Sequence, residues 1–371
     1  MTDPKSYWVG FNMVKGIGSV RFSALLDHFE RMELAWSASR SDLLSAGLSE
    51  RIVDGIIKFR GEADLDRIWK NITERGIQVL TWNDEDYPKH LKQIDQPPPV
   101  IYTRGRIDFE DDSAIAIVGT RRASAYGRQI ANDLAGFLAR NGITVVSGLA
   151  RGIDGIAHES AIKNGGRTLA VLGSGVDVVY PPEHRLLSEK IIEQGALVSD
   201  YPPGTPPDST NFPPRNRIIS GLSMATVVIE AGETSGALIT ASFAANQGRD
   251  VFAVPGNINA PQSCGTNRLI ENGARPLLKF EDLMDALSLE RINEKRAVKK
   301  MIPADPIEQK LTTVLSYQAT HIDEIVSLSS LPIEKVSATL AMMELKGMVH
   351  HVGSMSYVLA KESQSDYWTG G

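Results

Sequence analysis

The chain has 371 residues and a mass of 40.4 kDa, enough for two or three domains of ordinary size. Its composition, 42% hydrophobic and 23% charged, is typical of a folded, soluble globular protein and excludes the disordered and fibrous classes. The formal net charge of -6 argues against a protein that coats duplex DNA, and the single cysteine, Cys264, excludes an intrachain disulfide and a multi-cysteine zinc site.

The start of the chain has no basic segment followed by an apolar one, so we expect no signal peptide, no membrane span and a cytoplasmic location. Residues 1–75 are predicted to form a small helical domain of the SAM or helix-hairpin-helix type. Apolar residues recur there at three- and four-residue spacing on both sides of Gly16-Ile17-Gly18, and a second hairpin is expected at Ala46-Gly47-Leu48. Such a turn either holds a DNA phosphate with its backbone N–H groups or only reverses the chain, and the sequence favours neither.

Residues 76–288 alternate between apolar strands and helices, which predicts a doubly wound, Rossmann-like α/β domain with a parallel sheet. Two short strands, 77–80 and 100–102, precede the main series. The strands of that series are expected at 114–118, 143–146, 168–172, 196–198, 225–229 and 251–254, with helices around 128–140, 155–164 and 238–247. Between Ser113 and Phe280 there are 15 Lys and Arg against 13 Asp and Glu, so this is the relatively basic part of an acidic chain.

Residues 289–303 are charged and poor in apolar side chains, which predicts a linker. Residues 304–362 are predicted to form a winged helix, with helices at 307–315, 322–328 and 333–346 and a strand hairpin at 348–352 and 355–359. The last of these helices has little net basic charge. This favours a protein contact or a structural role over DNA recognition.

Five glycine-rich or arginine-rich segments follow strands of the predicted sheet. In an open parallel sheet, ligands bind beyond the carboxyl ends of the strands, where backbone N–H groups and helix N-termini gather. The segments are 118–128, 147–158, 172–185, 211–217 and 230–240. Arginines beside Phe212 or Tyr126 suit a single strand of nucleic acid, because rings stack on bases while guanidinium groups contact phosphates. We interpret Asp154 as a cap of the following helix and His158 as a structural residue.

The motifs in these segments resemble those of the DNA-processing protein A family, also called DprA or Smf. The resemblance is carried, in order, by Gly119-Thr120-Arg121, the segments 147–154, 171–175, 212–223 and 235–241, and Val254-Pro255-Gly256. It covers residues 80–280 and implies a protein that binds single-stranded DNA, forms a homodimer, loads the RecA recombinase during natural transformation, and has no catalytic activity or cofactor.

The candidate DNA-binding residues combine this resemblance with the strand-end rule. They are Gly119, Thr120, Arg121, Arg122, Ser124, Tyr126, Gly148, Arg151, Gly152, Gly173, Arg185, Phe212, Arg215, Arg217, Ser235 and Gly236. The family often places a lysine after the Tyr-Pro pair, where this chain has Pro182-Glu183-His184, and Arg185 is the expected substitute.

Two alternatives remain open at the level of sequence. The first is a nucleotide-processing enzyme related to the phosphoribohydrolases, although the Pro-Gly-Gly-x-Gly-Thr motif of those enzymes is replaced here by Glu230-Ala231-Gly232-Glu233-Thr234-Ser235-Gly236. The second is a protein that mainly bridges other proteins, as its acidic flanks suggest.

Overall fold

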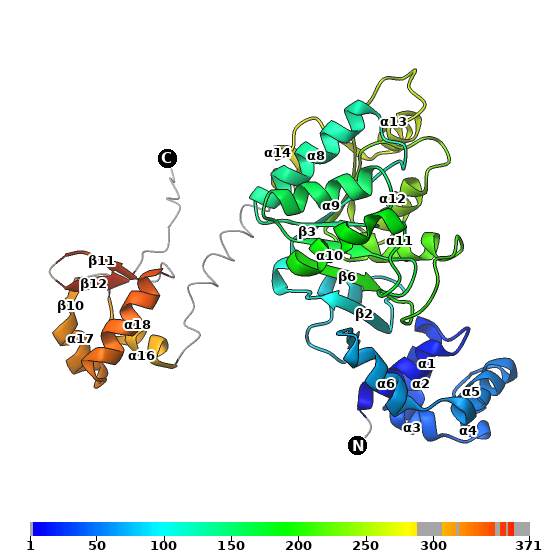
Figure 1. Cartoon of the computed structure of the whole chain (residues 1–371), viewed down its shortest axis with the longest axis horizontal. Helices are drawn as coiled ribbons and strands as arrows, with labels where there is room; N and C mark the ends of the chain where they lie inside the picture. Colours follow the sequence, from blue (N-terminus) through cyan, green and yellow to red (C-terminus); the bar gives the residue numbers. More distant parts are fainter. Residues whose placement is uncertain (1–2, 288–305, 317–318, 346–348, 354, 360–371) are drawn as a thin grey trace, which may run out of the picture. The chain divides into compact units, whose positions relative to one another are not determined.

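The computed structural model describes residues 3–287, 306–316, 319–345, 349–353 and 355–359. It divides into two compact units, Met1–Leu283 and Met284–Gly371, which we treat separately (Figure 1). The predicted linker, 289–303, lies outside the described residues. The four domain boundaries expected from the sequence therefore stay predictions.

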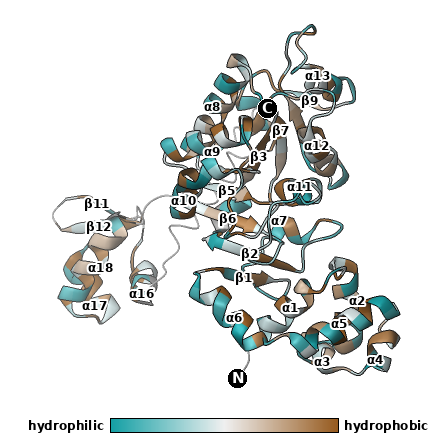
Figure 2. Ribbon diagram, turned by 45° about the vertical axis from the view of Figure 1, so that its right-hand side comes forward, coloured by the Kyte–Doolittle hydropathy of each residue, from teal (hydrophilic) through white to brown (hydrophobic). Residues whose placement is uncertain are grey.

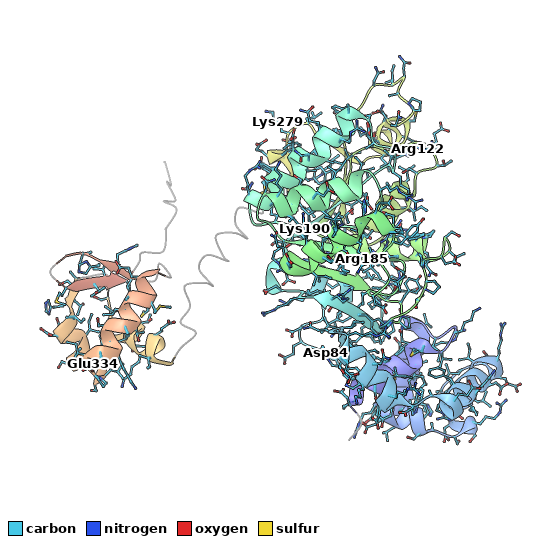
Figure 3. All side chains as sticks on the ribbon, viewed as in Figure 1. Asp84, Arg122, Arg185, Lys190, Lys279 and Glu334 are labelled. Carbon is cyan, nitrogen blue, oxygen red and sulfur yellow. The ribbon has the colours of Figure 1, made fainter. Side chains whose placement is uncertain are left out.

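The first unit begins with six helices that share one apolar core with the neighbouring edge of the sheet. Trp8, Phe11 and Phe22 stack or meet edge-on, and the same cluster of buried residues includes Val79 and Tyr102 of the sheet. Lys5 also pairs at 2.6 Å with Asp84, which is labelled in Figure 3. The N-terminal helices are therefore packed firmly onto the α/β fold. They are α1 (Pro4–Met13), α2 (Ser19–Phe29), α3 (Met32–Ser37), α4 (Arg40–Ser45), α5 (Glu50–Glu62) and α6 (Leu65–Glu74).

The centre of the first unit is a nine-stranded sheet in the order β1-β2-β6-β5-β4-β3-β7-β8-β9. Strands β6 to β9 of that order are parallel, whereas β1 and β2 form an antiparallel edge. The strands are β1 (Gln78–Thr81), β2 (Val100–Gly105), β3 (Ala114–Val118), β4 (Thr144–Ser147), β5 (Thr168–Val171), β6 (Gly195–Ser199), β7 (Ala225–Val228), β8 (Asp250–Ala253) and β9 (Arg275–Pro276). The predicted doubly wound α/β fold is confirmed.

Helices cover both faces of this sheet, which explains why β3 to β7 consist almost entirely of buried residues. Figure 2 shows the apolar strands between two helical layers. One layer contains α8 (Ala125–Arg140), α9 (Ile153–Lys163) and α10 (Arg185–Gln194), and the other contains α7 (Lys89–Lys92), α11 (Phe212–Gly221) and α12 (Gly236–Asn246). Helix α13 (Cys264–Glu271) packs against β8, and α14 (Glu281–Ala286) follows β9 in the sequence; the short 3-10 helices are η1 (Phe109–Asp112) and η2 (Pro182–His184).

Two local differences from the expected elements affect the site. The segment 211–217, identified in the sequence as one that follows a strand, forms the first turns of α11 from Phe212 onward. Pro213 fits there because the first turn of a helix does not need every backbone N–H. Helix α10, which was not predicted, starts at Arg185 and buries Leu187 and Ile191, one helical turn apart.

The second unit is a winged helix with its own core of Leu311, Ile325, Val336, Leu340 and neighbouring residues. Its helices are α16 (Pro306–Val314), α17 (Ile322–Ser329) and α18 (Ile333–Leu345). A three-stranded sheet, β10-β12-β11, completes it, with β10 (Thr320–His321), β11 (Val349–His351) and β12 (Ser356–Leu359). The predicted winged helix is confirmed, with the short strand β10 in addition.

Candidate nucleic-acid interface

A cleft of about 710 Å³ opens at the carboxyl ends of β3 and β7. Strands β4, β5 and β6 lie on one side of β3, and strands β7, β8 and β9 lie on its other side. The winding direction of the chain therefore reverses between β3 and β7. That point is where open α/β sheets bind ligands. The cleft is lined by Gly119, Thr120, Arg121, Arg122, Ala150, Asp154, Tyr180, Phe212, Arg215, Ser235, Gly236 and residues adjoining them.

The loop after β3 presents two arginines from a fixed backbone. The Thr120 N–H donates to the Glu230 carbonyl at 2.7 Å, and the Ser124 N–H donates to the Glu230 carboxylate at 2.9 Å. Ser124 also caps α8 by accepting from the Gly127 N–H at 3.1 Å. Between these anchors, Arg121 and Arg122 are exposed, and neither forms an ion pair with any residue that the structure describes. The loop therefore holds two guanidinium groups available for an anion.

The loop after β4 forms the floor of the cleft and is held by side chains. The buried Asp154 carboxylate accepts from the N–H groups of Gly148 at 3.2 Å and Ala150 at 3.3 Å. It thus secures the preceding loop, whereas the cap position of α9 belongs to Gly152, so the expectation that Asp154 caps this helix is wrong. Gly152 has φ +78, and a Cβ there would lie 2.4 Å from the Thr120 carbonyl oxygen, so only glycine fits.

Arg215 is 95% buried and acts as a brace rather than a free phosphate ligand. Its Nη1 donates to the Gly148 carbonyl at 2.9 Å and also to the Val171 carbonyl, joining the loop after β4 to the end of β5. Burial lowers the pKa of Arg215 to about 10, and burial likewise raises the pKa of the neighbouring Asp154. This pair of opposite charges beneath the cleft fixes its shape.

His158 is fully buried, as its structural interpretation requires. Its Nδ1 lies 2.6 Å from the Thr168 hydroxyl, which itself donates to the Val145 carbonyl at 2.8 Å. The histidine must therefore donate from Nδ1, and burial, aided by His184 and Arg215, lowers its pKa to about 3. A neutral imidazole enclosed in this way does not face the cleft.

Aromatic rings form one wall of the cleft. The Phe212 ring centroid lies 5.7 Å from that of Tyr180, with an interplanar angle of 34°. The guanidinium carbons of Arg121 and Arg215 each lie 5.9 Å from the Phe212 centroid. Phe212 also rests on Gly173, where a Cβ would approach the ring to 2.8 Å. Cations and rings thus lie side by side, as in proteins that bind single strands.

Eight of the sixteen predicted residues line the cleft: Gly119, Thr120, Arg121, Arg122, Phe212, Arg215, Ser235 and Gly236. Ser235 caps α12, accepting from the Ala237 N–H at 3.3 Å. Gly148, Gly152, Gly173 and Ser124 lie behind the lining and shape it.

The other four predicted residues lie outside the cleft lining. Tyr126 is 48% exposed and donates to the Pro255 carbonyl at 3.2 Å. Arg151 pairs with Glu183, and their hydrogen bond raises the pKa of the arginine and lowers that of the glutamate. Arg185 lies on the surface near Glu189, its Nε 3.6 Å from Oε1 of that residue (Figure 3). Arg217 is bound to Asp200 at 2.7 Å and to the Gln96 carbonyl at 2.6 Å.

Tyr180 and Glu230 are among the residues of the site that were not predicted. Tyr180 belongs to the segment 172–185 that the sequence singled out, but only Gly173 and Arg185 of this segment were chosen. Glu230 looked like part of a loop motif; the signal that could have identified it is a lone carboxylate at the end of an apolar strand. Within the described ranges, no cluster of three or more His, Cys, Asp or Glu residues is arranged to hold a metal ion.

The Gly16-Ile17-Gly18 turn lies at a separate groove, lined also by Gln96, Asp200 and Tyr201. Gly16 has φ +93, and the Ser19 hydroxyl donates to the Pro97 carbonyl at 2.7 Å. The predicted hairpin is present, and part of its surface packs against the sheet domain. Whether its N–H groups contact DNA stays a prediction.

The fold and the cleft define a Rossmann-like domain with a cleft at its switch point, joined in sequence to a winged helix. Residues 78–288 match the family DNA recombination-mediator protein A, and residues 297–353 match the DprA winged helix domain. The chain belongs to the DNA recombination-mediator protein A family.

Individual relatives agree with this assignment over most of the chain. The chain is 35% identical to the protein Smf of Synechocystis over 390 residues, covering 95% of this chain and 98% of that protein. The solved structure of DNA processing protein A from Streptococcus pneumoniae superposes with a TM-score of 0.68 at 31% identity, covering 76% of this chain and 97% of that chain. DNA processing protein A from Helicobacter pylori, described for its single-stranded DNA binding mode, gives a TM-score of 0.52 at 30% identity over 57% of this chain and 97% of that chain.

Proposed function

We propose that this protein binds single-stranded DNA in the cleft between the loops after β3 and β7. The observation that carries the proposal is the placement of the exposed Arg121 beside the Phe212 ring, at 5.9 Å, with Arg122 next to it. Guanidinium groups neutralise phosphates while a ring stacks on an unpaired base. The Helicobacter pylori relative, reported to bind single-stranded DNA, supports the same ligand here.

Single strands suit this cleft better than duplex does. Base faces are enclosed in a duplex and cannot reach Phe212, whereas every base of a single strand offers its face. The experiment is a titration of fluorescent oligo-dT with blunt duplex as competitor. We expect the duplex to compete poorly, and equal or tighter binding of duplex would refute the proposal.

We propose further that the protein protects incoming DNA, acts as a homodimer and loads RecA during natural transformation, in the cytoplasm. The winged helix supports a protein-contact role. Its described residues include five acidic ones against two lysines: Glu308, Asp323, Glu324, Glu334 and Glu344 against Lys310 and Lys335. No helix in the described part of the chain is long and apolar enough to cross a membrane.

Among its described residues, the exposed face of α18 offers one group of the kind that most often reads bases, Lys335 in its first turn. Recognition helices use Arg, Lys, Asn or Gln for this purpose. After its first turn, α18 exposes Ser337, Ala338, Ala341 and Met342, while Glu334 lies near its start (Figure 3). We therefore expect a chain that ends at residue 302 to bind oligo-dT normally but to lose RecA recruitment. Loss of DNA affinity would instead make the winged helix a DNA reader.

We propose that the cleft has no catalytic role. Its carboxylate Asp154 is buried and already accepts two backbone hydrogen bonds, so it is poorly placed to attack or protonate a nucleotide. The enzyme alternative predicts release of free base from nucleoside monophosphates. If the wild type releases free base and a variant with a changed cleft residue does not, the proposal is overturned.

A further inference from the structure

Tyr180 is a solvent-exposed aromatic side chain beside Phe212. It is 40% exposed, lines the cleft, and comes from the loop after β5, whereas Phe212 starts α11. The Tyr180 ring centroid and the Arg121 guanidinium carbon lie 5.7 and 5.9 Å from the Phe212 centroid, so both side chains border the Phe212 ring.

The environment of Tyr180 differs from that of the tyrosines that stabilise the fold. Tyr102 is fully buried and its hydroxyl donates to Asn12 at 2.9 Å, and Tyr87 is 2% exposed and donates to the Pro98 carbonyl at 2.7 Å. The Tyr180 hydroxyl, in contrast, makes no hydrogen bond with any residue that the structure describes. A large exposed ring without such an anchor contributes little to folding and is available to a ligand.

The Phe212 ring is held in place by its neighbours and cannot take over the position of Tyr180. Its ring lies against Gly173 on a neighbouring loop, and the brace Arg215 lies 5.9 Å from its centroid. A base stacked on Phe212 therefore occupies a fixed position, and the next base along the strand meets whatever lies beside that ring.

We propose that Tyr180 stacks on a second base, so that the cleft takes two consecutive nucleotides of one strand. This inference rests on the proposed binding of single-stranded DNA. The two ring centroids are 5.7 Å apart and the ring planes are inclined by 34°, so bases stacked on these rings would not lie parallel as they do in a duplex. This arrangement needs unpaired bases, whose faces are free to stack on protein rings.

The test compares three variants of the full chain in oligo-dT titrations at several salt concentrations. Tyr180→Ala should weaken binding roughly tenfold, within the range reported for loss of one base–aromatic stack. Its salt slope should stay unchanged, because the ring carries no charge. Tyr180→Phe should bind like the wild type, since the ring and not the hydroxyl is used. Tyr180→Trp should show fluorescence that oligo-dT quenches beyond the quenching of the wild type.

The outcomes separate this inference from the function on which it rests. If Tyr180→Ala binds like the wild type while Arg121→Ala is weakened, Tyr180 is not a base-stacking residue and the proposed function stands. If Tyr180→Ala weakens binding only together with a lower melting temperature, and Tyr180→Trp is not quenched, the inference also fails. If neither Arg121→Ala nor Tyr180→Ala affects binding, the cleft itself is not the DNA site.

Discussion

Replacing Arg121 with alanine removes the side chain that the structure places best for a DNA phosphate. The residue is exposed and has no ion pair within the described residues, and its guanidinium carbon lies 5.9 Å from the Phe212 ring centroid. An exposed cation–π contact contributes about 0.5–1 kcal/mol, so the melting temperature should change little. A hydrogen bond to a charged phosphate contributes about 1.5–3 kcal/mol, so oligo-dT affinity should fall at least roughly tenfold.

The assay is fluorescence anisotropy of labelled oligo-dT over a series of salt concentrations, with thermal unfolding measured in parallel. Loss of one phosphate contact should reduce the slope of log affinity against log salt by about 0.7–1. Arg140→Ala is the matched control, because Arg140 ends α8 and donates to Asn164 at 2.7 Å, outside the cleft lining. Wild-type affinity for Arg121→Ala, or weaker binding explained by unfolding alone, would refute the assignment of this loop.

Three further changes test the cleft and its surroundings. Gly173→Ala should weaken oligo-dT binding several-fold, since the new Cβ would lie 2.8 Å from Phe212. Gly61→Ala, in open space on α5, is the control. Unchanged binding by Gly173→Ala would contradict the role of Phe212. Glu183→Gln should tighten binding at low salt and steepen the salt dependence, because it releases Arg151 from its carboxylate; no change would show that Arg151 stays away from DNA. Between about pH 6.5 and 3, an unfolded chain protonates His158 while the folded chain keeps it neutral. The free energy of unfolding should therefore decrease as the pH falls, by about 1.4 kcal/mol per pH unit. Thermal unfolding of His158→Gln across this range should show a shallower pH dependence than the wild type, and equal slopes would contradict the assignment.

The position of the cleft could be predicted from sequence because it follows from topology. Once the apolar strands were identified, the loop carrying Arg121 had to lie at the carboxyl edge of the sheet. The orientation of individual arginines could not be predicted in the same way. Arg215 and Arg217 are two residues apart on α11, and only the packed structure shows that the first joins the loop after β4 to β5 while the second is bound to Asp200.

The ion pairs and packing contacts of individual residues likewise could not be predicted from the sequence. Arg151 and Arg185 follow strand ends, as expected, but Glu183 and Glu189 compete for their charge. No sequence motif distinguishes Tyr180 from a tyrosine of the core. Only its exposure in the folded protein distinguishes it. The Glu230 carboxylate is 112 residues beyond β3 in sequence, and it meets Ser124 only because β3 and β7 are neighbours in the sheet.

Photochemical cross-linking tests most directly whether this cleft is the DNA site. The full chain is irradiated with an oligo-dT that contains 4-thiothymidine, and the cross-linked peptides are identified by mass spectrometry. We expect cross-links in the peptides that contain Phe212 and Tyr180, and their loss in Arg121→Ala at moderate salt. Cross-links concentrated instead on the Gly16-Ile17-Gly18 turn or on α18, with none at the cleft, would contradict the account.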